Sequence, residues 1–332
     1  MLLRLTFAAL AAALVVAPAF ARCAEGETKL LLGLVEPQEN SPLQRGSNIL
    51  KERIDRNLQG RFCLELVRDS GRFTSSAAIP ELQEQDVQLA LVDLADLGRF
   101  VPLAQVYRLP FAFRHERAQQ AFQTTVLPNF NERLSQNGAT ALAFLQRPAV
   151  HLGARKPLFE PSHMAGAKVR VVGAANMARA RLRLLDAVPQ APSDAGVLED
   201  LKAGRVDVVE GRWDELQKLA ADKQITHVLE AHQLADGYVL LASSNWWGEQ
   251  SEAFKRELTP LIAEAVQQAN FRAANAERNN RRRALEAGLD VRILTDGQRL
   301  RWTQRLADLW GDFRASNPPV VVKALEDANR DF

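Results

Sequence analysis

The chain has 332 residues, of which 47% are hydrophobic and 25% charged, a composition typical of a globular protein of about two domains. Its net charge of +2 gives no reason to expect a nucleic-acid partner. The five histidines lack metal-ligand spacing to one another or to the cysteines, so no metal site is expected. The sequence also lacks a nucleophile elbow, a phosphate-binding loop and a dinucleotide fingerprint, so we expect neither a cofactor nor enzymatic activity.

The first residues form a predicted secretory signal peptide. Arg4 supplies a basic start, the apolar segment 5–17 follows, and Pro18 leads to the small-x-small sequence Ala19-Phe20-Ala21. The apolar segment is shorter than the ~20 residues that a membrane span needs, which disfavours an uncleaved anchor. We therefore expect cleavage after Ala21, export across the inner membrane to the periplasm, and no direct insertion of the mature chain into the membrane.

Two cysteines, Cys23 and Cys63, remain in the mature chain. Cys23 lies just before the apolar run 29–35, and Cys63 lies at the start of the apolar run 62–67. The two cysteines approach each other at one sheet edge if those runs are neighbouring parallel strands. The periplasm permits a disulfide. The alternative is one flexible cysteine and one core cysteine.

The mature chain opens with a predicted β-α-β unit. The run 29–35 is continuously apolar, apolar residues from Leu43 to Leu58 recur at helical spacing, and 62–67 is again apolar. This order predicts a parallel sheet with a right-handed crossover. The same alternation continues with a helix at 79–85, a strand at 87–92, a helix at 116–133, strands at 139–145, 150–154 and 168–172, a helix at 176–185, and strands at 206–209 and 238–243.

The longest predicted helix follows the strand 238–243. Thr259 is a good N-cap, Pro260 suits the first helical position, and Gly288 marks the stop. A helix from 259 to about 287 is roughly 40 Å long at 1.5 Å per residue, enough to bridge two lobes. Because no low-complexity linker occurs, we expect the chain to cross between lobes in ordered strands or helices.

Arg170 is a charged residue inside the apolar strand 168–172. A charge in such a strand is costly unless it is paired, so Arg170 either forms an internal ion pair or faces a ligand. Glu210, Arg212 and Trp213 follow the strand 206–209, at the carboxyl end where open α/β sheets bind ligands. The alternative for these three residues is an ordinary surface loop.

Four motifs in this order resemble the solute-binding subunits of tripartite ATP-independent periplasmic (TRAP) transporters, over residues 29 to about 313. The motifs are Phe100-Val101-Pro102 with Leu109-Pro110-Phe111-Ala112-Phe113, Pro161–Gly166 with Lys168-Val169-Arg170-Val171, Leu198–Asp207, and Tyr238–Ser243 with Trp246-Trp247.

This resemblance implies a two-lobe type II periplasmic binding fold that closes on its ligand, with a long helix bridging the lobes. Lobe I would comprise residues 22–147 and about 237–272, and lobe II residues 148–236 and about 273–332. Arg170 would pair with a carboxylate of a small organic acid, and membrane permease subunits would receive that acid.

The chain departs from the family pattern at two places. Gly211 stands where the family usually has asparagine, and Val150 stands where many members have arginine. Arg147 and Arg212 are candidate substitutes for the missing arginine. The full set of candidate ligand-binding residues is Arg170, Glu210, Arg212, Trp213, Arg147, Tyr238, Glu36 and Arg72.

Two other functions fit parts of this pattern. A periplasmic ligand sensor would use the same binding chemistry and present its closed form to a receptor kinase. A periplasmic enzyme is the weaker alternative, because the sequence shows no assembled nucleophile–base pair.

Overall fold

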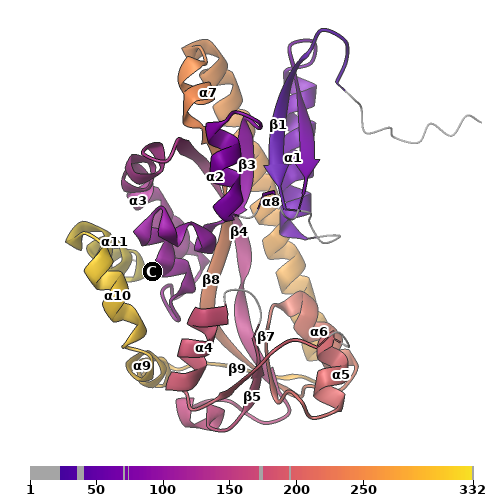
Figure 1. Cartoon of the computed structure of the whole chain (residues 1–332). Coiled ribbons are helices and arrows are strands. Elements are labelled where there is room, and N and C mark those ends of the chain that lie inside the picture. The colour runs from indigo at the N-terminus through magenta and orange to yellow at the C-terminus, as the bar shows by residue number, and fades with distance from the viewer. Residues whose placement is uncertain are drawn as a thin grey trace, which may run out of the picture.

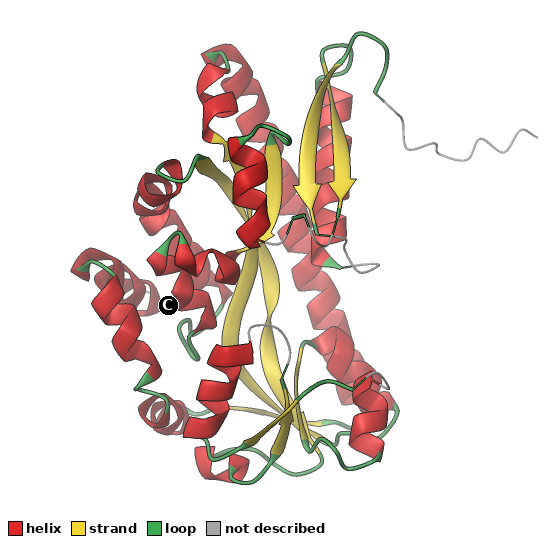
Figure 2. Ribbon diagram, viewed as in Figure 1, coloured by secondary structure: helices red, strands yellow, loops and turns green. Residues whose placement is uncertain are grey.

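The computed structural model describes residues 23–35, 41–69, 72–73, 75–171, 175–193 and 196–330. The predicted signal peptide, its cleavage site and the candidate Glu36 lie outside these residues. Within the part of the chain described, no helix is both long and apolar enough to cross a membrane. Figures 1 and 2 show two α/β lobes, one above the other, connected by strands and by one long helix.

The predicted β-α-β unit opens lobe I. Strands β1 (Thr28–Leu34) and β2 (Phe62–Arg68) pair in parallel, and α1 (Pro42–Asn57) connects them. The side chain of Ser41 accepts a hydrogen bond from the backbone N–H of Gln44 and so caps α1. A disulfide joins Cys23 to Cys63, with 5.4 Å between their Cα atoms, at the sheet edge where β1 and β2 begin.

The rest of lobe I adds another strand to this sheet and a second hydrophobic core. Strand β3 (Leu89–Asp93) pairs with β1 after α2 (Ser75–Gln83). Two 3-10 helices, η1 (Leu94–Arg99) and η2 (Pro102–Arg108), and α3 (Glu116–Ser135) then bury their apolar faces in a common core.

Two long antiparallel strands run through both lobes. β4 (Ala139–Ala154) pairs with β8 (His227–Ser243) along most of their length. The sequence predicted separate strands at 139–145 and 150–154, whereas the structure has one strand with a register shift between Arg147 and Val150. Pro148 lies in this shift, where the strand pairing is interrupted and a residue without an N–H is tolerated.

Lobe II extends the same sheet from the far ends of β4 and β8. The strand order is β2-β1-β3-β8-β4-β7-β5-β6, and β9 pairs with β8. The elements of this lobe are η3 (Pro161–Met164), β5 (Lys168–Arg170), α4 (Ala175–Leu184), β6 (Val188–Gln190), α5 (Gly196–Lys202), β7 (Val208–Gly211), α6 (Trp213–Ala221) and β9 (Asp290–Ile293).

The predicted bridging helix is present as α8 (Glu252–Glu286), preceded by the short α7 (Ser244–Glu249). The predicted start at Thr259 and Pro260 was wrong: Ser251 caps the helix by accepting from the N–H of Phe254, and Pro260 lies inside it. The helix begins earlier because the Phe254 ring packs on Phe62, with ring centroids 4.6 Å apart. Buried residues of α8 contribute to the cores of both lobes.

The C-terminal segment returns to lobe I through α9 (Asp296–Arg305), α10 (Leu309–Ser316) and α11 (Pro319–Arg330). Trp302 of α9 is buried in the lobe II core, whereas Val321 and Leu325 of α11 share the lobe I core with Phe122 and Phe130. The last helices therefore differ from their expected place in lobe II. Helix α11 packs against α3, and α10 contacts η2; both C-terminal helices lie on the left of Figure 1.

Candidate ligand-binding site

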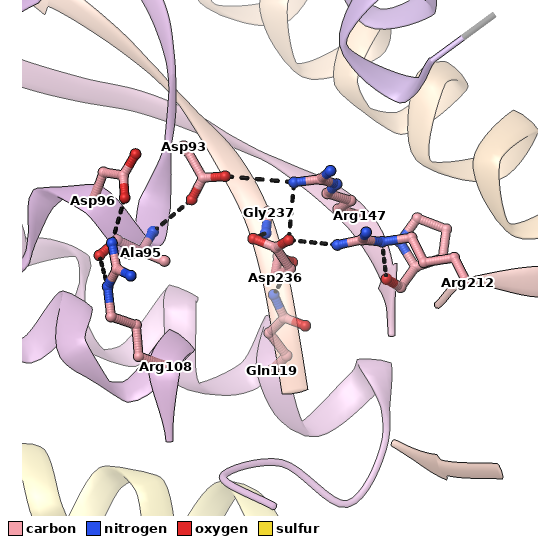
Figure 3. Close-up of polar contacts among 10 residues, drawn as sticks. Asp93, Ala95, Asp96, Arg108, Gln119, Arg147, Arg212, Asp236 and Gly237 are labelled. Atoms are coloured by element: carbon pink, nitrogen blue, oxygen red, sulfur yellow. Dashed lines mark hydrogen bonds and ion pairs between the residues drawn. The ribbon is translucent and has the colours of Figure 1, made fainter. Parts of the chain in front are cut away.

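Charged side chains from both lobes meet where β4 and β8 cross between them (Figure 3). We call Asp93, Arg147, Arg212, Asp236 and Tyr238 the hinge cluster. The Nη1 of Arg147 lies 3.0 Å from Asp236 Oδ2 and 3.4 Å from Asp93 Oδ2, and Arg212 Nη2 lies 2.5 Å from the same Asp236 oxygen. One carboxylate oxygen of Asp236 thus joins an arginine of the crossing strand to an arginine that follows β7 in lobe II.

The backbone fixes the positions of these side chains. Asp236 is the register partner of Arg147, and Tyr238 is the register partner of Asp93. The Arg147 guanidinium lies 5.4 Å from the centre of the Tyr238 ring, within range of a cation–π contact. At Gly237, a Cβ atom would come within 2.9 Å of the Leu145 carbonyl oxygen, so a glycine is needed for the strands to approach.

Burial and the nearby Asp236 raise the pKa of Asp93 to about 7, although Arg147 opposes the shift. Burial also lowers the pKa of Arg212, and repulsion from Arg147 acts in the same direction. The hinge cluster is therefore a tightly packed group of charges in which each change of one charge affects its neighbours.

Arg170 forms a second pair, within lobe II. It is the last residue of β5, and its Nη1 lies 3.5 Å from Oε1 of Glu215 in the first turn of α6. The buried Nε of Arg170 has no hydrogen-bond partner among the described residues. The Arg170 guanidinium thus has more N–H donors than its single ion pair uses, and guanidinium donors are suited to anions.

Two of the predicted residues, Glu210 and Trp213, are largely buried in lobe II. Both Glu210 carboxylate oxygens lie 2.6 Å from Nη2 of Arg181, and the two side chains are 10% and 3% exposed. Trp213 is 1% exposed and packs on His151, with ring centroids 5.3 Å apart. A buried arginine thus holds the Glu210 carboxylate, whereas Trp213, although largely buried, also lines a pocket that includes Arg147.

Arg72 lies apart from the hinge cluster. It forms ion pairs with Glu81 of α2 and with Asp86, both in lobe I. The structure therefore groups Arg147, Arg212 and Tyr238, places Arg170 in a neighbouring pair, and gives Arg72 another set of partners.

Sequence reasoning missed the acidic residues of the site. Asp93 ends a buried strand, the same signal that selected Glu210 and Arg212, and could have been found that way. Asp236 and Glu215 carry no such signal, because they become partners of arginines only through the pairing of β4 with β8 and the start of α6.

One group of described residues has the spacing of a metal site, Cys23, Glu27 and Cys63. Its two sulfur atoms are joined in the disulfide, so they offer no thiolates to an ion.

Two α/β lobes joined by crossing strands and a bridging helix, with arginines gathered at their junction, define a two-lobe solute-binding protein. The model of bacterial extracellular solute-binding protein family 7, DctP, matches residues 34–317. The chain belongs to this family, which confirms the resemblance to TRAP solute-binding subunits.

Curated relatives are similar to this chain over most of their length. The C4-dicarboxylate-binding periplasmic protein DctP of Vibrio cholerae is 24% identical over 94% of both chains. The C4-dicarboxylate-binding protein DctB of Bacillus subtilis is 20% identical over 88% of this chain and 84% of its own.

Solved structures confirm the two-lobe fold. A TRAP periplasmic solute-binding protein from Shewanella oneidensis with bound succinate has a TM-score of 0.74 at 22% identity, covering 92% of this chain and 100% of its own. One from Ochrobactrum anthropi, with its C-terminus bound in the ligand-binding pocket, has a TM-score of 0.80 at 16% identity, covering 92% of this chain and 96% of its own.

Proposed function

We propose that this protein captures a small carboxylate between its lobes in the periplasm and presents the closed form to a TRAP-type membrane permease. The observation that carries the proposal is the pair of arginines where the lobes meet, Arg147 and Arg212, with Arg170 in the neighbouring pair with Glu215. Family membership and relatives named for binding dicarboxylates support the same conclusion. Export of the mature chain after cleavage at Ala21 is part of this proposal.

Arg170 is the residue most suited to hold the ligand. A guanidinium presents parallel N–H donors that match a carboxylate, and such charge-assisted bonds contribute roughly 1.5–3 kcal/mol each. Arg212 donates to the Pro148 carbonyl and to Asp236, whereas Arg170 has one long ion pair and an unused Nε. Arg170 can therefore bind a carboxylate without breaking an optimal internal contact.

Closure needs a junction that bends while both lobes stay intact. The lobes are joined by β4, β8 and α8, and the β4–β8 ladder is irregular between Arg147 and Val150. A ligand that contacts both lobes shifts the population toward the closed form, because only that form makes both sets of contacts.

Thermal unfolding with a panel of small carboxylates tests the proposal, using the mature chain and its Arg170→Ala variant. A ligand at 100 times its dissociation constant adds about 2.7 kcal/mol of stability, which raises the melting temperature of the native protein but not of the variant.

Arg155→Ala is the matched control, since Arg155 donates to Gln224 at an exposed position of lobe II. The control should keep the ligand-induced shift. The absence of a shift with every carboxylate, or equal shifts in native protein and Arg170→Ala, would refute carboxylate capture by Arg170.

A further inference from the structure

Resting on the proposed function, we infer that the captured acid is an α-amino acid and that Glu215 selects it. Its carboxylate binds Arg170, and its ammonium group binds Glu215. The inference comes from the balance of charges at the site and from the geometry of the Arg170–Glu215 pair.

The charged side chains at this site are balanced in number. The cations are Arg147, Arg170, Arg212 and Lys218, and the carboxylates that interact with them are Asp93, Asp214, Glu215 and Asp236. A dicarboxylate would add two negative charges to this group. A zwitterion adds none, so the charge balance favours it.

The carboxylate of Glu215 lies close to residue 211, where any side chain would crowd it. Gly211 has no Cβ, and a Cβ built there would lie 3.0 Å from Glu215 Oε2. Glu215 can therefore extend across the end of β7 toward Arg170. An acidic group is thus held beside the arginine that is best placed to bind a carboxylate.

This arrangement sets a condition on the ligand. A carboxylate that binds Arg170 competes with Glu215, whose own pKa is raised, chiefly by burial, although Arg170 opposes the shift. A ligand without a cationic group leaves Glu215 beside a second carboxylate, which is unfavourable. An α-amino acid supplies a counter-charge one carbon away from its carboxylate, on the scale of the 3.5 Å between Arg170 and Glu215. Both protein groups then remain paired.

Pairs of probes that differ only in the group beside the carboxylate provide the test: alanine and lactate, aspartate and malate, glutamate and 2-hydroxyglutarate, and phenylalanine and phenyllactate. Isothermal titration calorimetry on the mature protein measures each affinity. We expect the amino acid to bind at least about tenfold more tightly than its hydroxy-acid partner, because the hydroxy acid has no ammonium group to pair with the Glu215 carboxylate.

Glu215→Gln keeps the shape of the side chain and removes its charge. We expect this variant to lose the preference for amino acids and to gain at least about tenfold in affinity for malate, because the competing carboxylate is gone. Glu199→Gln is the matched control: it makes the same change of net charge at an exposed pair with Lys202. The control should retain the native preference.

The outcomes separate this inference from the proposed function. Tight, Arg170-dependent binding of malate or another hydroxy acid by the native protein, without an amino-acid preference, overturns the inference and leaves carboxylate capture standing. Amino-acid binding unchanged by Glu215→Gln also overturns it. Absence of binding by all eight probes counts against both the inference and the proposed function.

Discussion

The buried pair of Arg181 and Glu210 gives a quantitative test of the structure of lobe II. The side chains are 3% and 10% exposed, so solvent screens their interaction very little. Removing one partner leaves the other as an uncompensated buried charge, which typically costs 3–5 kcal/mol. We expect Arg181→Met and Glu210→Gln each to lower the free energy of unfolding by about 3 kcal/mol.

The double variant Arg181→Met/Glu210→Leu should recover most of this loss, because replacing both members of a buried pair by apolar groups is often neutral or stabilising. Urea unfolding followed by far-ultraviolet circular dichroism measures all three variants. Glu199→Gln, at a half-exposed pair, should change stability by less than about 1 kcal/mol. Single variants at Arg181 and Glu210 that behave like this control would refute a buried pair and return Glu210 to the list of ligand contacts.

Three further changes have defined expected results. Replacing both Cys23 and Cys63 by serine removes a cross-link between residues 40 apart and should lower the free energy of unfolding by about 3–4 kcal/mol, measured by urea unfolding of the native protein and the variant without reductant. Burial raises the pKa of Glu277 to about 7. The folded state therefore holds this proton more tightly than the unfolded chain, and the resulting stabilisation is complete below the ordinary pKa and is lost as the pH rises through 7. The difference in unfolding free energy between Glu277→Gln and the native protein at pH 4 serves as the reference. At pH 8 this difference should shift in favour of Glu277→Gln by at most about 3 kcal/mol. An equal pH dependence of the two proteins would contradict this expectation. Gly33→Ala would place a Cβ 2.3 Å from the Phe73 ring and should cost about 1–3 kcal/mol, whereas Gly248→Ala, with no heavy atom within 4 Å of the added carbon, should not destabilise the protein.

Much of the fold follows from local patterns in the sequence. Apolar runs and helical spacing located β1, α1, β2 and α3 within a few residues, because each element buries one side in a lobe core. The start of α8 could not be found in this way. Thr259 and Pro260 provide a good local start signal, but packing of Phe254 on Phe62, far away in the sequence, extends the helix toward its N-terminus.

The candidate site was predicted in part. Arg170 stood out because a charge inside an apolar strand needs a partner, Arg212 because it follows a strand, and Arg147 as a substitute for an arginine of the family pattern. The sequence does not say which partners these arginines take. Glu210 and Arg212 both lie near the end of β7, but one pairs inward with Arg181 and the other with Asp236. That choice depends on strand pairing and on the position of α4, which are properties of the assembled lobes.

The return of α11 to lobe I affects the order in which the protein can fold. Val321 and Leu325 complete a core that also contains Phe122 and Phe130, nearly two hundred residues earlier in the chain. Such long sequence separations slow folding, because a large loop must close before the contacts form. Lobe I therefore stays incomplete until the last helix has been made.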